Sequence, residues 1–129
     1  MFSAKAFLKY RSKIVKLAEI TLLNGGDISG DTKADLQNVR QFKEGTFFLH
    51  HSGLTGTSKS LTVAVVTKDP AGSTSTHFHE IANFGTRSSA SAEGNRKVVA
   101  ANMGENIAIT WVKGNVDNAT TFTVYGVCK

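Results

Sequence analysis

Cysteine and proline are almost absent from this chain of 129 residues, which has one of each. Its single cysteine, Cys128, cannot form a disulfide within the chain, so the fold does not depend on oxidation. No His or acidic residue lies near Cys128 in the sequence to activate it, and we interpret it as a semi-buried or C-terminal thiol. The single proline, Pro70, lies in Lys68-Asp69-Pro70-Ala71-Gly72, which is predicted to form a turn.

Long hydrophobic runs are also lacking, since no segment approaches the roughly 20 apolar residues that a membrane-spanning helix needs. The apolar stretch 14–23 is interrupted by Lys16 and Glu19, and the residues that follow it, Asn24-Gly25-Gly26, do not form a typical cleavage site. We therefore expect neither a membrane span nor a secretory signal.

Acidic residues are missing from the N-terminal segment. From residue 17 onward the chain has ten basic and ten acidic residues, so the formal net charge of +5 lies in the first sixteen residues. These basic residues are Lys5, Lys9, Arg11, Lys13 and Lys16. The segment 2–13 fits a short amphipathic helix and equally an extended arm. Such an arm can bind an acidic protein surface or a polyanion, and it can equally be an ordinary solvated terminus.

The body of the chain is rich in Gly, Thr, Ser, Val and Asn, which suits short strands joined by turns. The clearest alternation places Leu61, Val63 and Val65 on one face of a strand. Strands are predicted at 14–23, 36–42, 46–51, 61–66, 77–84, 97–101, 106–112 and 121–127. Seven or eight strands at this spacing predict an all-β, antiparallel β-sandwich or jelly-roll-like domain over 14–129, preceded by a basic arm over 1–13.

The last four predicted strands are expected to form two hairpins. In the first, 97–101 turns at Asn102-Met103-Gly104 into 106–112, where Ile107, Ile109 and Trp111 share a face. In the second, a looser connection over 113–118 leads into 121–127. The segment 87–95, rich in small residues, is predicted to be a loop.

The four histidines are the residues that most suggest a metal site. His77 and His79 would project from the same face of a strand and could ligate zinc if a third ligand came from a neighbouring strand. His50 and His51 are adjacent and point to opposite faces. No Cys or Asp lies close to His77 and His79 in the sequence, so a polar strand face at the surface or at a subunit contact is the favoured interpretation. We therefore predict no metal site.

Motifs that carry catalysis are not found in this sequence. There is no nucleophile elbow, no Walker loop and no dinucleotide-binding glycine pattern followed by an acid. The Gly-rich stretch 53–57 opens no helix and is a weak candidate for a phosphate loop. We therefore expect a protein that is not an enzyme, with no catalytic residues and no cofactor.

A resemblance spans 42–127. The sequence 42–49 leads into the glycine-rich stretch 53–57, and the strand 61–67 ends in the turn Asp69-Pro70-Ala71-Gly72. The strand His77-Phe78-His79-Glu80-Ile81-Ala82-Asn83-Phe84 follows, and later come the segments 107–111 and 119–124. This pattern resembles the small β-sandwich structural proteins of tailed bacteriophage virions, in which a Lys/Asp-Pro-Gly turn precedes a Phe-x-x-Ile/Val-Ala-x-Phe strand.

The resemblance implies a role in the virion without catalysis. Such proteins decorate or cement the capsid, or act as adaptors in the neck and tail. The implied partners are the major capsid protein or other virion subunits, bound by a homo-oligomer or by copies on the capsid lattice after assembly in the host cytoplasm. If so, Lys5, Lys9, Arg11 and Lys13 would contact acidic capsid surface, and an extended arm could also add a strand to a neighbour's sheet.

Three other functions remain open. A carbohydrate-binding module of a fibre or of a neck or tail component would present exposed aromatic rings, for which Tyr10, Trp111 and Tyr125 are the candidates. A metal-dependent enzyme of jelly-roll type would use His77 and His79. Nucleic-acid binding through the basic arm is not favoured, because the body does not spread basic and aromatic residues over one face. Of the three, carbohydrate binding ranks first.

Overall fold

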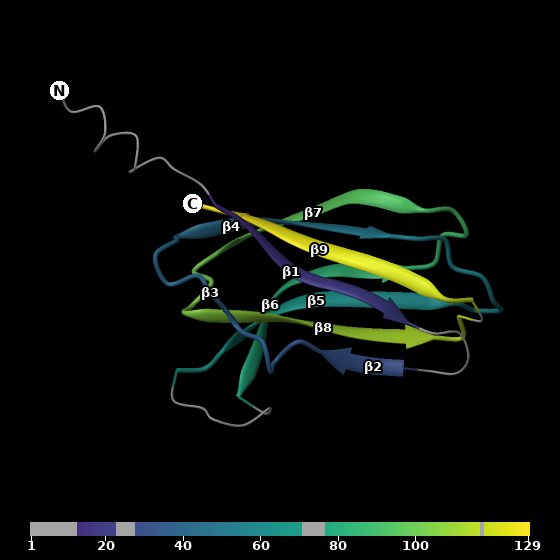
Figure 1. Cartoon of the computed structure of the whole chain (residues 1–129), viewed down its shortest axis with the longest axis horizontal. Helices are drawn as coiled ribbons and strands as arrows, with labels where there is room; N and C mark the ends of the chain where they lie inside the picture. The colour runs from purple at the N-terminus through teal and green to yellow at the C-terminus, as the bar shows by residue number, and fades with distance from the viewer. Residues whose placement is uncertain (1–12, 23–27, 71–76, 117) are drawn as a thin grey trace.

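The structure, a computed structural model, describes residues 13–22, 28–70, 77–116 and 118–129 (Figure 1). The basic arm was predicted over 1–13. Residues 1–12 of it lie outside the described residues, whereas Lys13 is the first residue of a strand. The strands are β1 (Lys13–Leu22), β2 (Ile28–Asp31), β3 (Gln37–Asn38), β4 (Glu44–His51), β5 (Ser60–Lys68), β6 (Phe78–Arg87), β7 (Glu93–Ala101), β8 (Asn106–Gly114) and β9 (Thr120–Cys128).

These strands form two antiparallel sheets that lie face to face (Figure 1). Sheet A has the order β1-β9-β4-β7, and sheet B has the order β2-β8-β5-β6, with β3 also paired to β8. The prediction of an all-β, antiparallel fold is confirmed. The described part of the chain has nine strands, because the segment between β1 and β4 contributes two short strands, of four and two residues.

The core lies between the sheets and follows the alternation of the strands. Phe47 and Leu49 of β4 are 0% and 1% exposed, whereas Phe48 between them is only half-buried on the outer side. The three aliphatic residues predicted to share a face of β5 are all fully buried. Phe47 also fits closely against its neighbour in the sheet, since a Cβ atom at Gly126 would lie 3.0 Å from its ring.

Both predicted hairpins are wrong. β7 belongs to sheet A and β8 to sheet B, while β9 belongs to sheet A again, so each connection crosses from one sheet to the other. A buried apolar side chain in each connection explains the difference, since Met103 and Val116 are both only 1% exposed and pack into the core. The turn residues predicted a reversal of the chain, but burial of these side chains carries the chain across the core.

Two further predictions need correction. In the segment predicted as a strand over 36–42, only Gln37–Asn38 pairs with β8. The buried Val39 then starts a turn, which is closed by the Phe42 N–H donating to the Val39 carbonyl at 3.0 Å. The segment predicted as a loop over 87–95 is mostly strand, since β6 extends to Arg87 and β7 begins at Glu93.

Phe47 and Phe48 test the orientation of β4 as a matched pair. We expect Phe47→Ala to lower the free energy of unfolding by about 3–5 kcal/mol, because it leaves a cavity in the core. Phe48→Ala removes the same group from the outer side and should cost about 1 kcal/mol or less. Urea unfolding followed by tryptophan fluorescence measures both, and equal costs would contradict the orientation described here.

Candidate functional site

The outer face of sheet A carries the most apolar exposed surface among the described residues. One row crosses all four strands in register and consists of Ile14, Val127, Thr46 and Val99. Ile14 and Val99, on the two edge strands, are 71% and 65% exposed, although both are aliphatic. Aliphatic side chains grouped on one exposed face are typical of a surface that binds another molecule.

A second row lies beside the first and combines aromatic with basic side chains. It consists of Lys16, Tyr125, Phe48 and Lys97, again one residue from each strand. Tyr125 is 38% exposed and Phe48 is half-buried, so two rings lie next to each other at the centre of the row. A lysine stands at each end. We call these two rows together the apolar patch.

A hollow of about 330 Å³ lies over β4 within this face. It is lined by Glu44, Thr46, Phe48, Lys97, Val127 and Lys129. The β4 residues run through its middle. Val127 of β9, with Lys129 just after that strand, lies on one side, and Lys97 of β7 lies on the other.

The charged groups around the apolar patch form exposed ion pairs. Lys16 Nζ donates to Glu19 Oε1 at 2.6 Å, and this hydrogen bond raises the pKa of Lys16 above its ordinary value. Lys129 Nζ lies 3.7 Å from Glu44 Oε1. Exposed pairs of this kind contribute little to stability, so these side chains can exchange partners when another charged surface approaches.

The outer face of sheet B is different in character. Its central row contains Ser29, Val112, Thr62 and Thr86, and Thr62 and Thr86 share a hydrogen bond of 3.2 Å. Val112, 55% exposed, is the one large apolar side chain exposed on this face in the described part of the chain. The two outer faces therefore differ, since three of the four exposed large apolar side chains of the described residues lie on sheet A: Ile14, Val99 and Tyr125.

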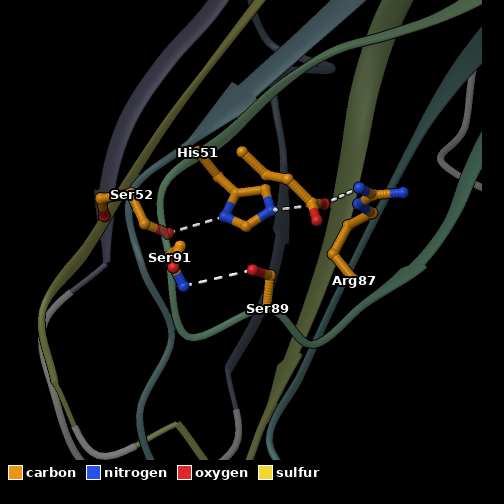
Figure 2. A network of polar contacts seen from close by, with 6 residues as sticks. His51, Ser52, Arg87, Ser89 and Ser91 are labelled. Carbon is orange, nitrogen blue, oxygen red and sulfur yellow. Dashed lines mark hydrogen bonds and ion pairs between the residues drawn. The ribbon is translucent and has the colours of Figure 1, made fainter.

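A polar cluster around the buried His51 joins the sheets at one end of the sandwich (Figure 2). His51 of β4, 1% exposed, lies with Nε2 at 3.6 Å from Glu93 Oε1 of β7, and Glu93 forms an ion pair with Arg87 of β6. His51 Nδ1 donates to the Ser52 carbonyl at 2.6 Å. The hydrogen bond of the His51 ring is therefore to a backbone carbonyl oxygen and not to a serine hydroxyl. The cluster connects β4 and β7 to β6.

The histidines predicted as metal candidates lie at the start of β6. His79 is exposed, with Nε2 at 3.5 Å from Asp69 Oδ2, and the His77 carbonyl accepts from the Asp69 N–H at 2.7 Å. Asp69 follows β5, and sequence reasoning missed this partner because it lies ten residues away from His79. No group of three or more His, Cys, Asp or Glu that could hold a metal ion occurs in the described ranges.

Two of the three aromatic residues considered for sugar binding, Trp111 and Tyr125, lie in different sheets. Trp111 packs edge-on against Phe122 at 5.6 Å between ring centroids, and it lies so close to Gly30 that a Cβ there would meet the indole at 2.5 Å. Tyr125 is exposed on the apolar patch. Tyr10, like Lys5, Lys9 and Arg11, lies outside the described residues.

Two other candidates have structural roles. Cys128 is fully buried, and burial raises the pKa of its thiol. In the glycine-rich stretch 53–57, Leu54 is fully buried, and Asn118 bridges the loop by donating to the Gly53 carbonyl and accepting from the Thr55 N–H, both at 2.9 Å. This loop therefore closes one end of the core.

The apolar patch itself was not predicted as a site. Its sequence signal was present, because Phe48 alternates with Phe47 and Leu49, and Tyr125 and Val127 alternate with Val124 and Cys128 in the same way. Reading those outward residues as a group requires the strand order, which brings β1, β9, β4 and β7 together.

No protein-family model matches this chain, and a search of curated proteins finds no match. Within the described residues there is also no helix long and apolar enough to cross a membrane.

The polar cluster around His51 generates a stability prediction. Arg87→Met keeps most of the side-chain volume but leaves the Glu93 carboxylate without its guanidinium partner. Because Glu93 is only partly buried, we expect a loss of about 2 kcal/mol in the free energy of unfolding, between the values typical of exposed and of fully buried pairs.

The matched control is Lys16→Met, which removes the cation of the exposed pair with Glu19 and should have a much smaller effect. Chemical denaturation of both variants at neutral pH provides the comparison. If Arg87→Met is as mild as Lys16→Met, the cluster does not connect the two sheets energetically.

Proposed function

We propose that this protein is a non-catalytic structural protein of a tailed-bacteriophage virion, a capsid decoration protein that binds the major capsid protein through the outer face of sheet A. The observation that carries the proposal is the apolar patch, in which Ile14 and Val99 are mostly exposed beside two aromatic rings. When a partner covers such a surface, apolar area is removed from water and the free energy falls.

The arrangement of the strands supports the proposal. The pairings are nested, since β1 pairs with β9, β2 with β8, β4 with β7 and β5 with β6. A long antiparallel ribbon that is rolled into two sheets produces this order, with β3 as an addition, and we assign the fold as a jelly roll on that basis. Jelly rolls are common in viral coat proteins and in sugar-binding domains.

The size of the face fits attachment to a lattice. Four strands at the usual spacing within a sheet, each counted over a length of six residues, cover a surface of roughly 400 Å². This is about half of the area that each partner contributes to a stable pairwise complex, roughly 800 Å². A single contact of this size is weak, but copies held on a repeating shell act together, and additional area from residues 1–12 would strengthen each contact.

Two exposed valines provide a matched test of the binding face. We expect Val99→Glu, on the apolar patch, to abolish co-sedimentation with empty shells of the virus that encodes the protein, because it places a charge in the contact. Val112→Glu makes the same change on sheet B and should bind like the parent protein, at a saturating fixed ratio to the shell subunit. Equal binding by both variants would exclude the face of sheet A.

The basic N-terminal segment gives a second test. Deletion of residues 1–12 removes Lys5, Lys9 and Arg11 but leaves β1 complete from Lys13, which pairs with Cys128. We expect loss of shell binding with an unchanged free energy of unfolding, because the strands remain whole. Undiminished binding by the shortened protein would contradict a role of this segment in attachment.

A second function, carbohydrate binding by a fibre or by a neck or tail component, is favoured by one observation. Phe48 and Tyr125 are paired neighbours on an exposed sheet face, where aromatic rings could stack against a sugar. Retention on a glycan array that is lost in Tyr125→Ala, without binding to shells, would favour this function over decoration. A ring-sized oligomer in solution that does not bind shells would instead favour a neck or tail position.

A further inference from the structure

The hollow over β4 combines an apolar base with a basic rim. Phe48 and Val127 contribute the apolar part of its lining, and Thr46 lies between them on the outer side of β4. Lys97 belongs to β7, and Lys129 directly follows β9 on the other side of β4, so cations flank the hollow on both sides. A ligand that fits this lining has an apolar group next to an anionic one.

The only carboxylate in the lining leaves room for such a ligand. Glu44 lies 3.7 Å from Lys129, and the Lys129 side chain is 64% exposed, so the pair is loose and open to solvent. Lys97 is exposed on the opposite side of the hollow. An incoming carboxylate can therefore approach Lys97 directly and compete with Glu44 for Lys129.

We propose that this hollow is a binding site for an acidic, partly apolar peptide segment of another protein. The apolar side chain of the segment lies against Phe48 and Val127, and its carboxylates contact Lys97 and Lys129. The inference rests on the proposed function, since the segment would belong to the shell protein to which this domain attaches, and it specifies the chemistry of that partner.

Charge argues against the other occupants. The protein's own segment 1–12 carries three basic residues and no acidic one, and it would be repelled by Lys97 and Lys129. A second copy docked through the same face would bring the same lysines together. Single-stranded nucleic acid stacks successive bases on several aromatic rings, whereas the lining of the hollow has one ring, Phe48, beside the aliphatic Val127.

The test is a titration of the full ¹⁵N-labelled chain, followed by NMR, with a capped heptapeptide that alternates Leu and Glu. We expect amide shifts in 44–48, 97–99 and 127–129, and binding that weakens as salt is raised. The same peptide with Gln or with Lys in place of Glu should bind more weakly. Lys97→Gln should weaken binding of the acidic peptide about two- to fivefold, as expected for one exposed ion pair.

Lys33→Gln is the matched control, because Lys33 follows β2 on the side of sheet B and should leave the affinity unchanged. Three results would overturn the inference: shifts centred on sheet B, an equal response to the Lys-containing peptide, or tighter binding of oligothymidylate to the same amides. Shell binding separates this test from the proposed function. If the protein binds shells but does not respond to the acidic peptide, the peptide site alone is overturned. If the protein responds to the peptide but does not bind shells, the site is supported and the virion role is rejected.

Discussion

The two-residue alternation of β4 and β9 is the constraint on which both the core and the candidate binding face depend. These central strands of sheet A place Phe47 and Phe122 in the core. The same backbone geometry places Phe48 and Tyr125 on the outer side, because successive side chains of a strand point in opposite directions. A shift of one residue in the pairing would exchange the two sets, so stability of the core also fixes the composition of the patch.

Closure of the two ends of the sandwich is achieved in different ways. At the end next to β7 and β8, Met103 fills the space under the connection, and Val116 and Leu54 do the same at the other connections. The polar cluster of His51, Glu93 and Arg87 adds a directional contact between β7 of sheet A and β6 of sheet B. Apolar burial holds the layers together, and the polar cluster specifies how they meet.

The sequence predicted the strands far better than their partners. Alternation identified β5 and the faces of β4 because burial on one side repeats every second residue, and this signal is local. The hairpin prediction after Ala101 failed because a turn signal contains no information about which sheet the next strand joins. The contact of His79 with Asp69 and the rows of the apolar patch depend on pairing between distant segments, which composition and spacing do not encode.

The nested pairing of the strands makes the apolar patch a property of the whole chain. The first and last strands, β1 and β9, pair with each other, and β4 and β7 from the middle of the sequence complete the same sheet. A patch built in this way forms only when the fold is complete, so an unfinished chain does not present it as a binding surface. Because the exposed apolar side chains gather on sheet A, the proposed function assigns only the outer face of sheet A to a partner. If the protein decorates a shell as proposed, this asymmetry favours attachment to the shell, since two adhesive faces would link copies to one another.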